Sequence, residues 1–534
     1  MDARGWSIKE KIGQMFIIAF GGEEMSTDLE KAIVDLNVGG VILFQRNLRD
    51  VKKVVQLIKD IQQTAKDHER PPLWISIDQE GGGIAYLWDG MIISPGNMLI
   101  AASGNEKHAY DASYIMGVQL KKIGFNMNFA PVIDINNNPK NPVIGARSYS
   151  ESAEVVSRLG QQSVQGYHDA GVLAVGKHFP GHGDTAFDSH LSLPKVDKKL
   201  KELEQFELLP FIENFKSGME AIMTAHIIYP ALDREYPATL SSFFLKSLLR
   251  EKYLFDGLII TDSMEMHAIS KYFGREAGSV KAVQAGADII LACGKDVASQ
   301  QVMIEAVEKS VIFGEIDEGV IDAAVDRILR FKDKWIDSSI FDTKEIDYSF
   351  LKQESFHKTM NNIALDGITL QFDRDRLVPL PKKAKIKVVS QTTYNDENYI
   401  GDRKSIVHKV FSEDRYELNY ITSANPTPSE VEQISESVKL QQDVVLLINE
   451  RRELDRSWLD LHGKIKEKTD RVIVVSLWNP QIIASFPKDL STYITTYSYT
   501  DHAIKQLKCL LEGQQAFKGK SPVNLLEIES ISHE

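Results

Sequence analysis

The sequence predicts an α/β protein, a (β/α)₈ barrel followed by a smaller αβα sandwich domain. Three observations support this prediction. Short apolar runs alternate with amphipathic stretches of helical periodicity up to about Trp335. Polar side chains directly follow many of these runs. After a charged and irregular stretch, a second alternation of apolar runs and helical stretches begins near Ile363.

Eight apolar runs in the N-terminal part have the length and composition of buried parallel strands. They are residues 15–20, 40–44, 73–77, 126–130, 172–176, 221–225, 257–261 and 287–291. Between them, residues 50–66 and 153–170 show the periodicity of amphipathic helices. Eight strands that alternate with helices over this length suit a (β/α)₈ barrel, and a doubly wound sheet is the competing α/β solution.

The placement of polar residues favours the barrel over the doubly wound sheet. A barrel gathers the residues that follow its strands on a single face, where catalytic groups lie. The polar residues that directly follow the predicted strands are Asp78, Asp134, Lys177, His178, His226 and Asp262. We therefore expect these side chains to meet at one end of the barrel.

The chain divides into three predicted parts. Residues 1–337 form the barrel, residues 338–362 form a linker, and residues 363–534 form the αβα domain. In the last part, apolar runs at 387–390, 443–448, 472–477 and 493–496 alternate with helical stretches such as 429–439 and 502–511. That part has no GxGxxG fingerprint after a strand, so we assign it no nucleotide.

Composition and charge argue against several classes of function. The 534 residues are 43% hydrophobic, which is enough for a large core. The 62 Lys and Arg against 75 Asp and Glu leave a formal charge of −13, which argues against nucleic acid or an anionic membrane as the main partner. A neutral or cationic small molecule suits this charge better. The N-terminus is charged and no run of about 18 apolar residues occurs, so we expect a cytoplasmic protein. Cys293 and Cys509 lie far apart in sequence, which suggests reduced thiols.

One segment, KHFPGHGDTAFDSH at 177–190, concentrates chemically active side chains. It contains two carboxylates, three imidazoles and an ammonium together with proline and glycine. This composition is typical of a loop that builds an active site. Within it, Asp188 and His190 have the spacing at which a carboxylate orients an imidazole and raises its basicity.

Two other interpretations of this loop stay open. An aspartate beside a histidine is often only a structural hydrogen bond. The loop also holds four competent metal ligands, although no short His-x-His pair or HExxH helix accompanies them. These four residues are His182, Asp184, Asp188 and His190.

Several segments together resemble the family 3 glycoside hydrolases, and more narrowly their β-N-acetylglucosaminidase branch. They are KHFPGHGDTAFDSH at 177–190, ISIDQEGG at 75–82, SPGNM at 94–98, NFAPVIDINNNPKNPVIGARSYS at 128–150 and ITDSMEM at 260–266. The resemblance runs from about Ile12 to the C-terminus and is weakest in the last domain. It implies a (β/α)₈-type barrel, with an added αβα domain that some members carry.

The resemblance also implies roles for individual residues. Asp262 matches the nucleophile that attacks the anomeric carbon, and His190 with Asp188 matches the histidine–aspartate acid/base pair of this branch. The residues that match those holding the hydroxyls of the first sugar are Asp78, Arg147, Lys177 and His178. No metal or organic cofactor is implied. The expected partners are oligosaccharides that contain N-acetylglucosamine, with no nucleic acid and no membrane.

The implied roles agree with the chemistry of a retaining glycosidase. Such an enzyme needs an ionised group below the anomeric carbon and a protonated group at the leaving oxygen. An imidazole has an unperturbed pKa of about 6.5, close to cytoplasmic pH, so His190 needs little tuning as the acid, and Asp188 would stabilise the imidazolium. Positive charge and hydrogen-bond donors are expected to keep Asp262 ionised. They would come from Lys177, His178 and Arg147.

The residues alone also allow plainer interpretations. Asp262 with Ser263 could cap a helix, and Asp78 could lie in a turn that the following glycines permit. Arg147 could pair with a surface carboxylate. His226 is predicted to line the pocket, with a hydrogen-bonded core histidine as the alternative. His182 and Asp184 are expected to shape the loop.

Two positions depart from the pattern of the branch and bear on the substrate. An arginine usual near Gly83 and another near Tyr86 are absent here. Their loss removes charge-assisted hydrogen bonds and leaves aromatic surface, because Tyr86 and Trp88 can pack on a neutral sugar ring. We therefore expect a retaining exo-enzyme that releases N-acetylglucosamine from the non-reducing end of short chitin oligosaccharides such as chitobiose. Muropeptide hydrolysis, phosphorolysis and non-catalytic sugar binding are the alternatives.

Overall fold

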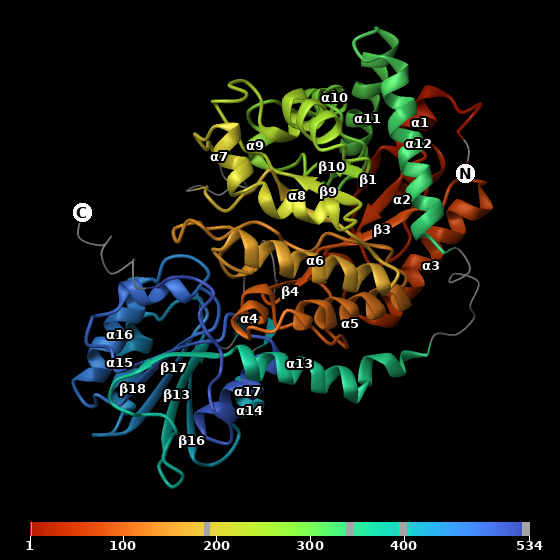
Figure 1. Cartoon of the computed structure of the whole chain (residues 1–534). Helices are drawn as coiled ribbons and strands as arrows, with labels where there is room; N and C mark the ends of the chain where they lie inside the picture. The colour runs from red at the N-terminus through yellow and green to blue at the C-terminus, as the bar shows by residue number, and fades with distance from the viewer. Residues whose placement is uncertain are drawn as a thin grey trace.

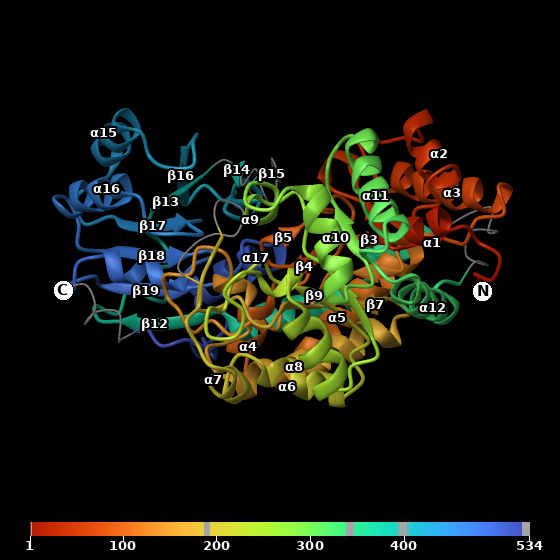
Figure 2. The same cartoon turned by 90° about the horizontal axis from the view of Figure 1, so that it is seen from above.

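The computed structural model describes residues 1, 3–185, 193–337, 347–391, 393–394, 403–404 and 406–525, and for 393–394 and 403–404 it describes the backbone alone. Two parts lie side by side in it (Figure 1). The N-terminal part contains a ring of strands with helices around it, and the C-terminal part is built on a second sheet. Figure 2 shows this second sheet on the side of the barrel that faces away from the N-terminus.

In the described part of the chain, nine strand segments form the ring, and all eight predicted runs are represented among them. They are β1 Phe16–Ile18, β2 Gly40–Ile42, β3 Trp74–Ile77, β6 Met127–Asn128, β7 Leu173–Ala174, β8 Gly176–Phe179, β9 Ala221–Thr224, β10 Leu258–Ile260 and β11 Ile290–Ala292. Their residues are buried throughout. This continuous burial explains why the runs are apolar on both faces and lack the alternation of a half-exposed strand.

Parallel pairing joins these strands into a closed barrel. β1 pairs with β11 on one side and with β2 on the other, and pairing continues through β3 and β6 to β7. β8 follows β7 after Val175 and pairs with β9, which pairs with β10. A bridge between Ile260 and Ile289 returns β10 to β11. Within the described residues, the predicted α/β arrangement of parallel strands is therefore confirmed as two hydrogen-bonded sheets that isolated bridges join, and the fifth predicted strand is in two pieces.

A short antiparallel hairpin follows β3 directly. Its strands are β4 Gln79–Gly81 and β5 Ile84–Ala85. Gly81 and Gly82 have φ of +93° and +59°, a left-handed conformation that glycine adopts without strain. The glycines after Asp78 therefore do form a turn, and the hairpin carries the chain from the barrel wall over the carboxyl end of the ring.

Amphipathic helices surround the barrel (Figure 1). In α3 the side chain of Asp50 accepts two backbone N–H groups at the N-terminus, and Val54, Ile58 and Ile61 form the fully buried face. The helices are α1 Ile8–Gln14, α2 Thr27–Val34, α3 Val51–Asp67, α4 Asn97–Ala102, α5 Lys107–Ile123, α6 Ala153–Asp169, α7 Leu200–Gln205, α8 Leu209–Lys216, the π-helix η4 Phe243–Lys252, α9 His267–Ser270, α10 Arg275–Ala285, α11 Val297–Ile312 and α12 Glu318–Trp335. None of the helices in the described part of the chain combines the length and the apolar character needed to cross a membrane.

The C-terminal part is a three-layer αβα arrangement. Its sheet has the order β12-β19-β18-β17-β13-β16, and only β12 runs antiparallel to its neighbour. The strands are β12 Thr369–Asp373, β13 Ile386–Gln391, β16 Tyr416–Ile421, β17 Asp443–Ile448, β18 Val472–Ser476 and β19 Thr492–Thr495. The helices α15 Pro428–Ser437 and α16 Arg456–Lys466 lie on one face, and α14 Val407–Val410 and α17 Asp501–Leu511 lie on the other (Figure 1). The strands β12 and β16 were not expected from the sequence.

The predicted linker differs in part from the structure. A 3-10 segment, η6 Tyr348–Lys352, and the helix α13 Glu354–Gly367 begin inside the interval 338–362. α13 packs on α4 and α5 of the barrel and on α17 of the C-terminal part. The helix is hard to recognise in the sequence, because only Met360, Ile363, Ala364 and Gly367 of its 14 residues are buried. The division of the chain into 1–337, 338–362 and 363–534 stays a prediction.

Candidate active site

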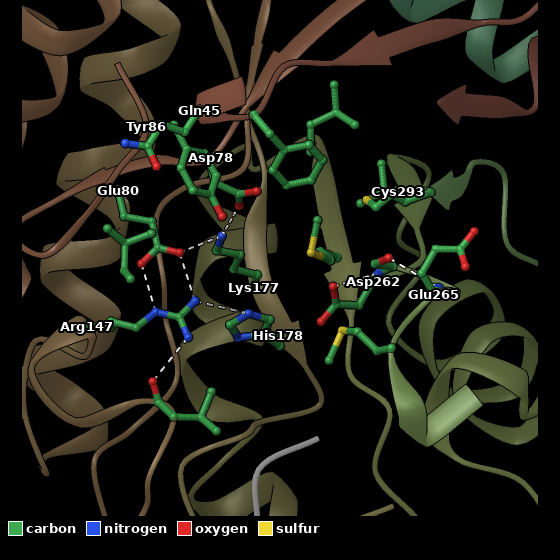
Figure 3. Close-up of a pocket in the computed structure, with 18 of the residues that line it drawn as sticks. Gln45, Asp78, Glu80, Tyr86, Arg147, Lys177, His178, Asp262, Glu265 and Cys293 are labelled. Atoms are coloured by element: carbon green, nitrogen blue, oxygen red, sulfur yellow. Dashed lines mark hydrogen bonds and ion pairs between the residues drawn. The ribbon is translucent and has the colours of Figure 1, made fainter. Parts of the chain in front are cut away.

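A pocket of about 680 Å³ opens at the carboxyl end of the barrel strands. Most of the predicted site residues line it: Asp78, Tyr86, Arg147, Lys177, His178 and Asp262. Figure 3 shows Asp262 on one wall, across the pocket from Lys177, His178 and Arg147. Residues separated by up to 184 positions in the sequence thus meet in one place, as expected for groups that follow the strands of one barrel.

An ion-pair network forms the wall opposite Asp262. The Lys177 ammonium lies 2.6 Å from a carboxylate oxygen of Asp78 and 2.6 Å from one of Glu80. Arg147 donates two hydrogen bonds to Glu80, from Nε over 2.9 Å and from Nη2 over 2.8 Å. The side chain of Lys177 is 2% exposed and that of Asp78 is 19% exposed, so Asp78 is the member with most access to the pocket.

Charge balance in this network favours the ionised forms of Glu80 and Lys177 despite burial, whereas burial has the larger effect on Asp78. Burial raises the pKa of Glu80, but Arg147 and Lys177 outweigh it and lower that pKa to about 2. Burial lowers the pKa of Lys177, and Asp78 and Glu80 more than compensate, so its pKa is raised. The pKa of Asp78 is raised, mainly by burial, with Lys177 acting in the opposite direction. Two cations and two carboxylates therefore present a dense set of donors and acceptors to a ligand.

His178 lies beside this network as a neutral imidazole. Its Nδ1 is 2.6 Å from a carboxylate oxygen of Asp134, and its Nε2 is 3.4 Å from Arg147 Nη2. Burial and the neighbouring cations Arg147 and Lys177 lower the pKa of His178 well below its usual value. Nδ1–H therefore donates to Asp134 and Nε2 is left as an acceptor. Of the three residues expected to supply positive charge and donors, Lys177 and Arg147 therefore carry the charge, because these two cations lower the pKa of His178.

Arg147 owes its position to a pair of loops that are held together by Asn141. The carbonyl oxygen of the Asn141 side chain accepts the N–H groups of Val143 and Ile144, which precede the 3-10 turn η2 Gly145–Arg147. Its amide group donates to the carbonyls of His182 and Gly183 over 2.8 and 2.9 Å. Arg147 is thus buried against a carboxylate inside the site and does not form the surface ion pair considered from its residue type.

Asp262 lies two residues beyond β10 and is half-buried. Its carboxylate accepts the backbone N–H of Ser263 over 2.7 Å. α9 begins only at His267 with Met266 as its N-cap, so Asp262 does not cap a helix. Its carboxylate lines the pocket opposite the ion-pair network, which is the position a group that attacks or stabilises a bound ligand needs.

His226 has a different place from the one predicted. It is not among the residues that line the pocket. Its Nδ1 is 2.8 Å from the Thr239 hydroxyl and its Nε2 is 2.9 Å from the Ser263 carbonyl, and its side chain is buried. The structure therefore shows the alternative arrangement, a buried and hydrogen-bonded histidine that supports the Asp262–Ser263 segment.

Aromatic surface in the pocket comes from Tyr86 and Phe44. Their ring centroids are 5.5 Å apart in an edge-to-face arrangement, and both residues line the pocket. Trp88 does not line it and instead stacks on Tyr499 of the C-terminal part, with centroids 6.1 Å apart. Of the two aromatic residues expected to pack on a sugar, only Tyr86 is therefore in a position to do so.

The segment that follows β8 is described only in part. Asp188 and His190 lie outside the described residues, so their predicted pairing stays a prediction. His182 lines the pocket, and its backbone N–H donates to Asp134 over 2.7 Å. Asp184 forms an ion pair with Lys198 over 2.7 Å. Within the described ranges, no group of three or more His, Cys, Asp or Glu side chains is arranged to hold a metal ion.

Two functional residues, Glu80 and Asp134, had no assigned role from the sequence. Glu80 is two positions after Asp78, so the extended backbone could have placed both carboxylates on one side. Asp134 was noted as a residue that follows a strand, but its partner His178 is distant in sequence. A local sequence pattern indicates which way a side chain points. The partner of that side chain, 44 residues away for Asp134 and 67 residues away for Glu80, is known only from the fold.

Three comparisons bear on the family of this chain. Residues 7–331 match the glycosyl hydrolase family 3 N terminal domain. The chain is similar to the solved structure of a glycoside hydrolase family 3 β-N-acetylglucosaminidase from Paenibacillus sp. str. FPU-7, with 38% identity and a TM-score of 0.90 over 98% of this chain and 99% of that one.

Curated relatives carry a related name. A β-hexosaminidase A from Pseudoalteromonas piscicida is 34% identical over 381 residues, which is 67% of this chain and 63% of the relative. The alignment thus spans less than two thirds of that relative. A β-hexosaminidase from Shewanella frigidimarina is 38% identical over 277 residues, which is 50% of this chain and 78% of the relative.

Proposed function

This chain belongs to glycosyl hydrolase family 3, and on that basis we propose that it is a retaining exo-β-N-acetylglucosaminidase. The observation that carries the proposal is the position of Asp262 across one pocket from the Asp78–Lys177–Glu80–Arg147 network. The β-N-acetylglucosaminidase and β-hexosaminidase names of similar proteins point to the same substrate class.

The ion-pair network suits the recognition of a neutral sugar. Hydroxyl groups donate and accept hydrogen bonds at once, and the network offers Asp78 as an acceptor together with Lys177 and Arg147 as donors. Because the opposite charges balance one another, a neutral ring can bind without leaving a buried charge unpaired. The pocket volume of about 680 Å³ also lies within the range of small-molecule sites.

The proposed mechanism has two steps. Asp262 attacks the anomeric carbon, the glycosidic C–O bond breaks, and the leaving oxygen takes a proton from His190, which Asp188 supports. A water molecule then attacks the anomeric carbon, the bond from that carbon to Asp262 breaks, and His190 accepts the proton that the water loses. This sequence restores both residues and releases N-acetylglucosamine with the configuration of the substrate. The roles of Asp188 and His190 follow from the resemblance alone.

We further propose that the physiological substrate is a short chitin oligosaccharide such as chitobiose. The edge-to-face pair of Tyr86 and Phe44 supports this, because aromatic rings pack on the apolar face of a neutral sugar. Position 83 carries no side chain, so no cation is available there to bind an acidic acceptor. A cell-wall muropeptide is the competing substrate.

The test measures hydrolysis of a chromogenic substrate, turnover of two natural substrates, and product formation in the presence of phosphate. We expect hydrolysis of a chromogenic N-acetyl-β-glucosaminide, near-complete loss in Asp262→Asn, and unchanged activity in Asp326→Asn, an exposed position of α12 with the same chemical change. Turnover of chitobiose should exceed that of an N-acetylglucosaminyl-anhydromuramic substrate, and the reverse order would refute the substrate assignment. Sugar 1-phosphate formed in the presence of phosphate would show phosphorolysis instead of hydrolysis.

A further inference from the structure

The C-terminal part contacts the barrel next to the ion-pair network. Trp478, two residues after β18, covers Gly83 in the hairpin that carries Glu80. A Cβ atom on Gly83 would lie 1.9 Å from the Trp478 ring, so there is no room for a side chain at this position. The Tyr499 hydroxyl donates to the Gly83 carbonyl over 3.3 Å. Trp478 thus fills the space that any side chain at position 83 would need.

A second contact reaches the loop that carries Arg147. Nη2 of Arg451 donates to the Val143 carbonyl over 3.2 Å, and Nη1 of Arg147 donates to the same carbonyl over 3.2 Å. The guanidinium of Arg451 lies 5.7 Å from the centroid of the Trp478 ring. The two contacts therefore support each other, and between them they reach the segments that carry both partners of the Glu80–Arg147 ion pair.

We propose that Arg451 and Trp478 are positioning residues of the sugar site, through which the C-terminal domain sets the affinity of the pocket for the first sugar. This inference rests on the function proposed above. Neither residue lines the pocket. They act through Val143 and Gly83, whose positions decide how Arg147 and Glu80 face the ligand.

Tight packing transmits a displacement of Trp478 or Arg451 to the ion-pair network. The cavity at this boundary, lined in part by Glu80, Arg147 and Trp478, measures only about 10 Å³. That volume is about what a single water requires, so the contact has little room to absorb a displacement. Hydrogen bonds from this network hold the sugar in the bound substrate and in the transition state alike. A shift of the network should therefore weaken substrate binding and raise KM while kcat changes little.

The sharpest test inserts one methyl group. The φ of Gly83 lies outside the left-handed region, so the backbone accepts alanine, and the three atoms nearest to the added Cβ all belong to the Trp478 ring. We expect Gly83→Ala to raise KM about 10-fold, and Trp478→Leu in the same chain to remove most of that increase by vacating the space. A folded Gly83→Ala enzyme with an unchanged KM would overturn the proposal.

The second test removes the guanidinium. Arg451→Met should raise KM about 5-fold with kcat within about 2-fold, and Arg451→Lys should recover part of the loss because it keeps a donor. Arg456→Met is the matched control, because Arg456 lies in α16 with its side chain 90% exposed. A merely structural role would lower the thermal midpoint and the amount of active enzyme without moving KM, and that result would also overturn the proposal.

Failure of this inference is separable from failure of the proposed function. If the wild-type enzyme does not hydrolyse N-acetyl-β-glucosaminides, the proposed function is wrong and the positioning role falls with it. If the wild type is active and both Gly83→Ala and Arg451→Met keep the wild-type KM, only the positioning role is wrong. Binding of free N-acetylglucosamine, measured by calorimetry, should weaken by the same factors as KM rises.

Discussion

Glu80→Gln should expose the electrostatic role of the buried network most directly. Glutamine keeps the shape of the side chain but removes the charge that Arg147 and Lys177 share. Arg147 would then lack its carboxylate and Lys177 would keep only Asp78. Breaking one partner out of a buried ion-pair network typically costs about 3–5 kcal/mol, because the remaining charge stays desolvated.

The pKa of Glu80 gives an independent magnitude for the stability that its charge contributes. Its pKa falls from the usual 4.5 to about 2 in the folded protein. A shift of this size corresponds to roughly 3 kcal/mol of stability that is present above pH 4.5 and is lost as the pH falls toward 2. About 2 kcal/mol of this should already be gone at pH 3, because the unfolded carboxyl is then almost fully protonated.

The assay is denaturant unfolding of both proteins between pH 6 and pH 3. The wild type should be more stable than Glu80→Gln by about 3 kcal/mol at pH 6, and the difference should shrink to about 1 kcal/mol at pH 3. Glu251→Gln, an exposed position of η4, is the control and should follow the wild type at every pH. Wild-type and Glu80→Gln curves that stay parallel over this range would refute the reasoning.

Three further predictions concern the proposed acid, a support of the proposed nucleophile and a buried amine. His190→Ala should slow hydrolysis of a sugar leaving group far more than that of an activated phenol, which needs little protonation, and equal losses in the two assays would contradict the acid/base role. His226→Ala removes the hydrogen bond to the Ser263 carbonyl, so kcat should fall about 10²-fold through displacement of Asp262 while KM stays nearly constant; an unchanged kcat would argue against this support. Burial lowers the pKa of Lys332 from 10.5 to about 7, so its burial reduces stability as the pH falls from 10.5 to 7. Lys332→Met should therefore raise the stability at pH 7 by a few kcal/mol and remove the pH dependence of stability between pH 7 and 10. An equal or lower unfolding midpoint of the variant at pH 7 would show that the buried amine does not destabilise the protein.

The barrel could be predicted from sequence because its signals are local. Each strand is a short apolar run, and each helix has an apolar face of regular spacing with a cap at its N-terminus, as in α3. The strand β16 was missed because residues 417–420 between its buried ends are only half-buried, and the polar Glu417 and Asn419 interrupt the apolar run. Helix α13 was missed because few of its residues are buried and tertiary contacts with α4, α5 and α17 stabilise it.

The site could be predicted where a residue's type and place next to a strand were enough. Asp78, Lys177 and Asp262 follow or lie within strands of one barrel, so their meeting at one end follows from the fold. His226 has the same sequence signature as His178, yet its ring points toward Thr239 and the Ser263 carbonyl. Local sequence does not state which of two strand-end histidines reaches the pocket.

The sequence by itself determined the alternation of strands and helices, and thereby the end of the barrel at which the polar groups gather, since these depend on interactions between residues close in the chain. The tertiary structure alone decided the charge states and partners. Glu80 is held ionised by Arg147, His178 is kept neutral by its neighbours, and Gly83 is covered by Trp478 from 395 positions away. Burial and the distance between charges set these properties, and both are known only when remote segments have come together.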